Sequence, residues 1–279
     1  MPLTEEARPG EAVNAPVEFT SDFKGKDVLL IGSGYSAEDI ACQCYNFGAK
    51  SMTITYRSFP TGCSNWPGSI KEVPLLERVD PYGRTCHFKD GSSKDVDAIV
   101  LCTGYLHDFP FMPESLRLVT GNRICPVGLY EGVVLEAEPI VFYLGMQAQF
   151  YSFTMFDAQA WYVRDVIMGR LSLPSIEEMK AHSEKWGVAE GEALAKRDVK
   201  TFQANYVKEL IGLTDCPVTP QMVDETLQMG SDWDKHKELG IMSYRDHPFR
   251  SAVTGSLAPE HQTPLIQQFD DSLESYLTH

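Results

Sequence analysis

The sequence predicts an α/β fold built around a parallel sheet, and three observations carry this prediction. The apolar run Val28–Ile31 leads at once into a glycine-rich turn, and a helical segment after the turn ends before Gly48. The β-rich segment Ser51–Tyr56 comes next, so strand, glycine turn, helix and strand form one βαβ unit with parallel strands. The near-continuous apolar segment Asp97–Cys102 is typical of another strand that is buried on both faces of such a sheet.

The other expected elements follow in order along the chain. Residues 1–24 are rich in proline and acidic side chains and are expected to form a linker or arm. The pair Asp90-Gly91 between two β-rich segments predicts a hairpin, and residues 140–144 predict a further strand. The spacing of apolar residues predicts helices at 36–47, 156–168, 177–186, 192–213, 224–239 and 269–277.

The composition excludes several classes of function. Against 39 Asp and Glu residues stand 24 Lys and Arg residues, and the net charge of −15 repels nucleic acids and anionic membranes, so neither is expected as a partner. No apolar run is long enough to span a membrane, and Met1–Pro16 lacks the apolar stretch of a signal peptide. The seven cysteines form no C-x-x-C pair and the histidines lack metal-like spacing. Reduced thiols, no bound metal and a cytoplasmic location are therefore expected.

A dinucleotide-binding turn is predicted between the first strand and the helix. The residues of this turn are Gly32, Ser33, Gly34, Tyr35, Ser36 and Ala37. Gly32 permits the tight turn, Gly34 lets the backbone approach a pyrophosphate, and the small Ala37 allows helix and strand to pack closely. The first N–H groups of the helix and the positive end of its dipole would face the phosphates. The alternative is a glycine-rich turn with a purely structural role.

The end of the second strand indicates which dinucleotide the turn holds. Sites for NAD place an acidic residue there, whereas sites for NADP offer an arginine to the 2′-phosphate. This strand ends in Tyr56-Arg57-Ser58 without an acidic residue. Because a guanidinium forms a forked bond to phosphate, Arg57 predicts NADP(H). The alternative is a solvated surface arginine.

Longer stretches of the chain resemble the flavin-containing monooxygenases, and among these the bacterial trimethylamine monooxygenases are the most similar group. The resemblance extends from about residue 25 to the C-terminus and includes the Thr103-Gly104-Tyr105 motif. The matching stretches are Gly25–Val28, Gly32–Ile40, Tyr56-Arg57, Asp97–Tyr105, Phe142–Gln147, Tyr151–Phe153, Met155–Tyr162, Arg245–His247, Ala258-Pro259 and Thr263-Pro264.

The resemblance implies an oxidoreductase that uses NADPH and FAD. In such flavoproteins reduced nicotinamide passes hydride to FAD, O₂ adds to give a flavin C4a-hydroperoxide, and a soft nucleophile takes up one oxygen atom. The implied reaction is N-oxidation of trimethylamine or a similar amine, with other amines and sulfides left open as substrates. The resemblance places Thr103, Gly104, Tyr105 and Gln147 near the cofactors, although a simple strand-end turn remains the alternative for the Thr-Gly-Tyr motif. It assigns no catalytic role to a residue of this chain.

The domain organisation follows from the same resemblance. We expect a linker at residues 1–24, a Rossmann-like NADP(H)-binding domain at 25–110, and the C-terminal part of an FAD domain with helices at 111–279. The chain has one glycine motif, of the NADPH type, so it resembles the C-terminal two thirds of such an enzyme. The alternatives are a non-catalytic NADP(H)-binding remnant and a subunit of a split flavoprotein. A missing part of the FAD domain would leave apolar surface exposed, and such surface favours a homo-oligomer.

Two departures from the family pattern concern amine recognition. Ala148 stands where the family has an acidic residue, and Leu265 stands where it has tryptophan. Both changes remove groups that attract an alkylammonium ion, since aromatic faces and carboxylates both bind such cations.

Overall fold

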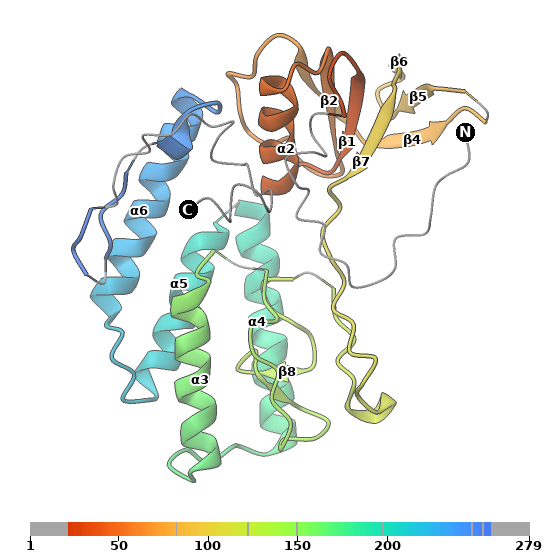
Figure 1. Ribbon diagram of the computed structural model, residues 1–279. Coiled ribbons are helices and arrows are strands. Elements are labelled where there is room, and N and C mark those ends of the chain that lie inside the picture. The colour runs from red at the N-terminus through yellow and green to blue at the C-terminus, as the bar shows by residue number, and fades with distance from the viewer. Residues whose placement is uncertain are drawn as a thin grey trace, which may run out of the picture. The chain divides into compact units, whose positions relative to one another are not determined.

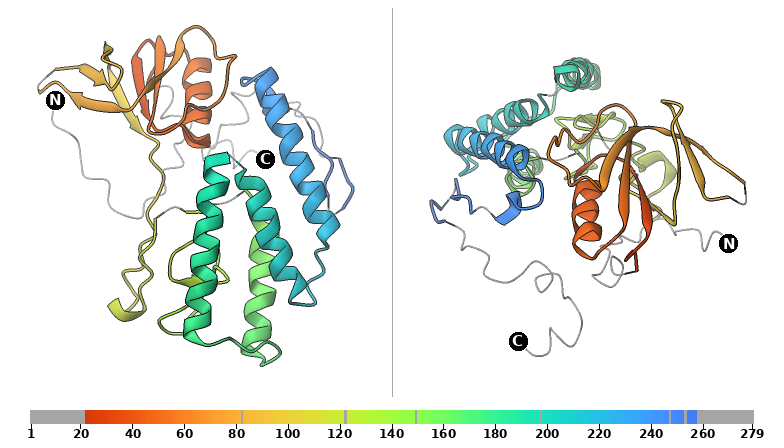
Figure 2. Two further views of the ribbon diagram at one scale, coloured as in Figure 1. Left: turned by 180° about the vertical axis from the view of Figure 1, so that it is seen from behind. Right: turned by 90° about the horizontal axis from the view of Figure 1, so that it is seen from above.

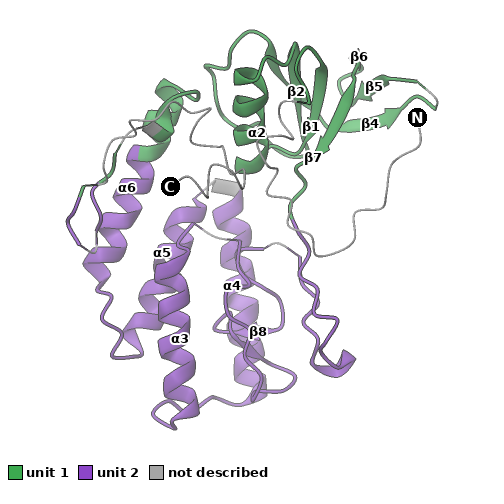
Figure 3. Ribbon diagram, viewed as in Figure 1, with its two compact units in different colours: residues 1–104, 233–249, 257–279 green, residues 105–232, 250–256 purple. Residues whose placement is uncertain are grey.

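The computed structural model describes residues 22–257 except residues 82, 122, 149, 197, 247 and 253. Contacts divide the chain into two compact units (Figure 3). The described residues of the first unit are those up to Gly104 together with 233–249 and 257, and those of the second are 105–232 and 250–256. The linker predicted at 1–24 lies almost wholly outside the described residues, and the terminal helix predicted at 269–277 lies wholly outside them.

The first unit is built on a four-stranded parallel sheet with one helix beside it (Figure 1). The strands β1 (Asp27–Ile31), β2 (Ser51–Tyr56), β3 (Ile70–Pro74) and β7 (Ala98–Leu101) lie in the order β3-β2-β1-β7. The helix α2 (Tyr35–Asn46) connects β1 to β2. All neighbouring strands of this sheet pair in parallel, so the predicted α/β fold with a parallel βαβ unit is confirmed.

The centre of strand β1, Val28–Leu30, is buried on both faces of the sheet, which explains why the sequence is apolar from Val28 to Ile31. Val28 and Leu30 pack with α2, whereas Leu29 packs on the opposite face with Cys86 and Phe88. Alternation along an extended strand sends neighbouring side chains to opposite faces. A strand with a core on each side must therefore be apolar at every position.

A three-stranded antiparallel sheet accounts for the residues between β3 and β7. It consists of β4 (Leu76–Val79), β5 (Thr85–Phe88) and β6 (Ser93–Asp95). The Asp90-Gly91 turn joins β5 to β6, and Gly91 has φ of +80°, which confirms the predicted hairpin.

The second unit consists mainly of helices and a short hairpin. The hairpin pairs β8 (Leu129–Tyr130) with β9 (Val134–Leu135). Of the helices α3 (Phe153–Ile167), α4 (Ile176–Lys196) and α5 (Val199–Gly212), α5 packs against both of the others (Figures 1 and 2). A further helix, α6 (Pro220–Leu239), is divided between the units after Asp232. Within the described part of the chain, no helix has the length and apolarity needed to cross a membrane.

Two sequence predictions for this unit are wrong. Residues 140–144 form no strand, and Phe142 makes one isolated bridge to Val134. The run cannot extend a ladder because Gly145 turns the chain with φ of +74°. The helix break predicted between 186 and 192 is also misplaced. The helix α4 is continuous through these residues and ends at Lys196, after which the N–H of Asp198 donates to the carbonyl of Ala193 before α5 begins.

Candidate dinucleotide-binding site

The predicted glycine turn lies at the carboxyl edge of the parallel sheet. The N–H of Gly32 donates to the carbonyl of Thr55 at 2.9 Å, and the N–H of Cys102 donates to the carbonyl of Ile31 at 2.8 Å. The turn after β1 is thereby fixed against the ends of β2 and β7. Open α/β sheets bind ligands at this edge.

Gly32 and Gly34 are glycines for different structural reasons. Gly32 has φ of +120°, and a Cβ there would collide with the carbonyl oxygen of Cys102. Gly34 has no atom within 4 Å of the place a Cβ would occupy, so its outer side is open. Gly34 also precedes the first turn of α2 and offers no side-chain cap. The N–H groups at this helix end are therefore open to an anion, and the residues fit a dinucleotide pyrophosphate.

The other residues of the turn complete this arrangement. The hydroxyl of Ser33 donates to the carbonyl of Phe59 at 2.8 Å, which holds the turn against the loop after β2. Ala37 is fully buried where α2 meets the sheet, as its predicted packing role requires. Tyr35 and Ser36 are exposed on the first turn of the helix.

Arg57 lies at the same edge, one residue beyond β2. Since β2 pairs with β1 through Thr55, this position is close to the glycine turn in the register of the sheet. The side chain is exposed, and no acidic side chain of the described residues forms an ion pair with it. Its guanidinium is therefore available to a phosphate.

The remaining predicted site residues fall in both units. Thr103 and Gly104 follow β7 at the carboxyl edge, and Tyr105 is the first residue of the second unit. Gln147 is buried in the second unit, where its amide donates to the carbonyl of Gly132 and the hydroxyl of Tyr206, both at 3.1 Å. A role for these four residues in cofactor binding stays a prediction.

The first unit also neutralises two acidic residues on α2. The Nζ of Lys237 lies 2.6 Å from the carboxylate of Glu38, and both side chains are nearly buried. Burial raises the pKa of Glu38, and the bond from Lys237 opposes that rise. Arg245 donates to both carboxylate oxygens of Asp39 at 2.7 and 2.8 Å. The two cations therefore remove negative charge that would repel a phosphate at this helix end.

Sequence reasoning did not find Lys237, because its partner is distant in the chain and lysines are common on helix surfaces. Arg245 lies in one of the stretches that resemble the monooxygenase family, but the resemblance gave it no role. The cations that pair with the acidic residues at the start of α2 could therefore be identified only from the fold.

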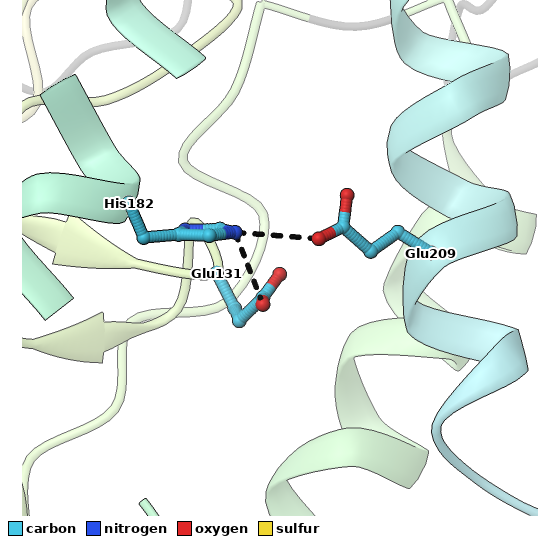
Figure 4. A group of neighbouring side chains, drawn as sticks. All are labelled: Glu131, His182 and Glu209. Atoms are coloured by element: carbon cyan, nitrogen blue, oxygen red, sulfur yellow. Dashed lines mark hydrogen bonds and ion pairs between the residues drawn. The ribbon is translucent and has the colours of Figure 1, made fainter. Parts of the chain in front are cut away.

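A second group of ionisable side chains lies in the helical unit and was also not predicted. Figure 4 shows Glu131, His182 and Glu209 pointing towards one another. The Nε2 atom of His182 lies 3.5 Å from the Oε1 atom of Glu131 and 3.3 Å from the Oε1 atom of Glu209. Burial raises the pKa of Glu131 to about 7, and the bond to Glu209 raises that of His182. The residues come from three elements, so no short sequence spacing could indicate them.

Comparison with known proteins gives consistent results. Residues 72–227 match the family model described as flavin-binding monooxygenase-like. The trimethylamine monooxygenase of Roseovarius sp. (strain 217) is 48% identical over 256 residues, which is 92% of this chain and 56% of that protein. That of Methylocella silvestris is 45% identical over 272 residues, 97% of this chain and 59% of that protein. The chain thus spans little more than half the length of these relatives.

Solved structures agree with this similarity. The crystal structure of Tmm from Pelagibacter sp. strain HTCC7211 has a TM-score of 0.80 and 44% identity, and covers 92% of this chain and 57% of that one. S-allyl-L-cysteine S-oxygenase from Allium sativum has a TM-score of 0.64 and 26% identity, and covers 82% and 52%. The expected fold class is confirmed, and the description of the matched family names a flavin as its ligand. The chain belongs to the flavin-binding monooxygenase-like family.

Proposed function

We propose that these residues form the NADPH-binding unit and the helical unit of an NADPH- and FAD-dependent monooxygenase that oxygenates trimethylamine. The observation that carries the proposal is the identity of 45–48% to proteins named trimethylamine monooxygenase, over at least 92% of this chain. O₂ would be the second substrate. A match of that length is far more specific than the glycine motif alone.

In this proposal the first unit selects and holds NADPH. The turn at Gly32–Ala37 binds the pyrophosphate through backbone N–H groups at the start of α2. Arg57 binds the 2′-phosphate and so favours NADPH over NADH. Thr103–Tyr105 and Gln147 would contact the cofactors. The chemistry that FAD supplies when bound is acceptance of hydride from NADPH and activation of O₂.

The substrate class in this proposal is a soft nucleophile, with trimethylamine favoured over sulfides by the names of the relatives. Ala148 is partly buried, and its N–H donates to the carbonyl of Arg123 at 2.6 Å. Its methyl side chain offers no charge to an alkylammonium ion. Leu265, the other departure from the family pattern, lies outside the described residues.

A second candidate is an NADP(H)-binding subunit whose FAD-binding turn comes from another chain. The observation that favours it is that the described residues hold one strand–glycine turn–helix unit, at Gly32–Ala37. A flavin monooxygenase binds two dinucleotides at once, and each pyrophosphate needs its own cluster of donors. On this basis we expect the isolated 279-residue chain to bind NADPH and to purify nearly colourless.

The two candidates differ in an assay of trimethylamine N-oxide. The 279-residue chain is incubated with NADPH, FAD and trimethylamine, alone and with the separately produced part of the Roseovarius relative that this chain does not match. N-oxide formed by the chain alone supports the first candidate, and N-oxide formed only with the added part supports the second. NADPH binding without N-oxide in both mixtures indicates a non-catalytic NADP(H)-binding remnant, and absence of NADPH binding contradicts both candidates.

A further inference from the structure

We propose that Glu131, His182 and Glu209 form a binding site for one divalent transition-metal ion, best matched by Zn²⁺. Glu131 lies in the turn between β8 and β9, His182 on α4 and Glu209 on α5. One ligand atom from each lies within 4.8 Å of the other two. The site would therefore clamp the hairpin to two helices of the second unit. It is independent of the proposed cofactor chemistry.

The distances between the ligand atoms suit a tetrahedral ion. Zn²⁺ binds histidine nitrogen and carboxylate oxygen at about 2.0–2.2 Å, so neighbouring ligands of a tetrahedral site lie about 3.3–3.6 Å apart. The Nε2 atom of His182 lies 3.5 Å from Glu131 Oε1 and 3.3 Å from Glu209 Oε1. Two edges of the tetrahedron thus already have the required length, which is longer than an ordinary ion-pair hydrogen bond.

The cluster is incomplete without a cation. The side chain of Glu131 is 4% exposed, and its second oxygen, Oε2, is buried without a hydrogen-bond partner among the described residues. The indole nitrogen of Trp186 lies 3.1 Å from Nε2 of His182, so a neutral His182 uses its one lone pair to accept the indole N–H. A metal ion would take this lone pair in place of the indole, and Nε2 and two carboxylate oxygens would then be its ligands. A divalent ion would make the cluster neutral, and burial of a charge is costly unless it is neutralised.

Glu190 shows how the same unit satisfies a buried carboxylate without a metal. Its Oε1 atom accepts hydrogen bonds from the N–H groups of Ile124 and Cys125, and Arg123 forms an ion pair with its Oε2 atom. Glu131 has the Tyr130 hydroxyl and the His182 ring as partners, but among the described residues it has no backbone N–H donor and no arginine. The contrast indicates that Glu131 is placed for a ligand rather than for a structural bond.

The backbone at Glu131 and the space beside it support the same conclusion. Glu131 has φ of +49°, and it is the one non-glycine residue with positive φ among the described residues. Such strain is characteristic of positions held for a functional reason. A cavity lined by Glu131, His182, Ser183 and Trp186 has about 20 Å³ of free space, which is room for about one water molecule. A metal-bound water would occupy the fourth position there.

The test is a titration of the chelator-treated 279-residue chain with Co²⁺, which replaces Zn²⁺ and gives visible absorption bands when bound with tetrahedral geometry. We expect one Co²⁺ per chain, displaced by Zn²⁺, together with a change in the fluorescence of Trp186. The change in fluorescence should be absent in Trp186→Phe. Thermal unfolding is measured in parallel, since an ion that clamps three elements stabilises the folded chain.

Three substitutions make the test specific. Glu131→Gln and Glu209→Gln should each weaken Co²⁺ binding at least about tenfold. Glu209 is partly exposed, so its replacement carries little risk to folding. Glu184→Gln is the matched control, because Glu184 is an exposed carboxylate on the same helix as His182, and it should bind as the unmodified chain does. Binding that is unchanged in both test variants, or absent in the unmodified chain, would overturn the proposal.

Discussion

The two units each bury a glutamate, and they treat its charge differently. In the first unit Glu38 lies 2.6 Å from the ammonium group of Lys237, at the start of a helix whose backbone N–H groups are open. In the second unit Glu131 faces His182 and Glu209 at longer distances. The two acids on α2 are paired with cations, so this helix start can accept a phosphate, whereas the cluster at Glu131 has two carboxylates and can accept a cation. A buried glutamate is thus associated with an anionic ligand in the first unit and with a cationic ligand in the second.

The largest effect is expected at the backbone of the glycine turn. Gly32→Ala should lower the free energy of unfolding by about 4 kcal/mol, because the new Cβ collides with a backbone carbonyl and φ is positive. Gly34→Ala is the matched control, since no atom lies within 4 Å of its Cβ position. It should leave the fold intact and weaken NADPH binding. Urea unfolding of both variants measures the difference, and equal stability would refute the close approach at Gly32.

The next effect tests how Glu38 is neutralised. Lys237→Met should cost about 3 kcal/mol at pH 8, because it leaves a buried carboxylate without its cation. Lys50→Met is the control, because Lys50 lies 2.7 Å from Asp27 but is 67% exposed, and its replacement should cost much less stability than that of Lys237.

The loss of folding stability in Lys237→Met should depend on pH. Burial already raises the pKa of Glu38 in the folded chain, and removal of the cation raises it further. The folded state therefore binds a proton that the unfolded state does not, and the variant gains stability as the pH falls below the folded pKa towards about 4.3. Unfolding at pH 8 and pH 5 measures this, and a loss that grows on acidification would contradict the account.

A smaller effect is expected for cofactor selection. Arg57→Ala should weaken NADPH binding by roughly 1.5–3 kcal/mol, on the order of ten- to a hundredfold, and leave NADH binding unchanged. Calorimetric titration with each cofactor measures both affinities. Equal weakening of the two would mean that Arg57 does not contact the 2′-phosphate.

The smallest losses of folding stability are expected when two buried glutamates of the helical unit are replaced. Glu190→Gln should cost about 1.5 kcal/mol, since it weakens charge-assisted bonds from Arg123 and two backbone N–H groups. Glu131→Gln in metal-free buffer should cost less than about 0.5 kcal/mol, because it removes a charge that is poorly compensated. Thermal unfolding ranks the two, and a larger loss at Glu131 would show that its charge is already satisfied.

The sequence predicted the sheet and the glycine turn because both depend on local patterns. Val28–Ile31 is apolar at every position, and Gly32 and Gly34 have the spacing that a strand–helix turn needs. The elements that were not predicted have weaker patterns in the sequence. The strand β3 ends at Pro74 and includes charged residues, and the break before α5 depends on one backbone hydrogen bond from Asp198.

The parts of the sites that depend on tertiary contacts were not predictable. Lys237 reaches Glu38 from another helix, and Glu131, His182 and Glu209 come from a turn and two helices. None of these residues has a sequence neighbour that indicates its partner. The position of Arg57 beside the glycine turn could be predicted, because parallel strands end at one edge of the sheet. Its role in binding stays a prediction.

The central claim is that the first unit binds NADP(H) at the glycine turn, and a crystal structure of the chain with NADP⁺ tests it most directly. The account predicts the pyrophosphate within hydrogen-bond distance of the first N–H groups of α2 and the 2′-phosphate at the guanidinium of Arg57. NADP⁺ bound away from Gly32–Ala37, or a turn left empty at saturating NADP⁺, would contradict it.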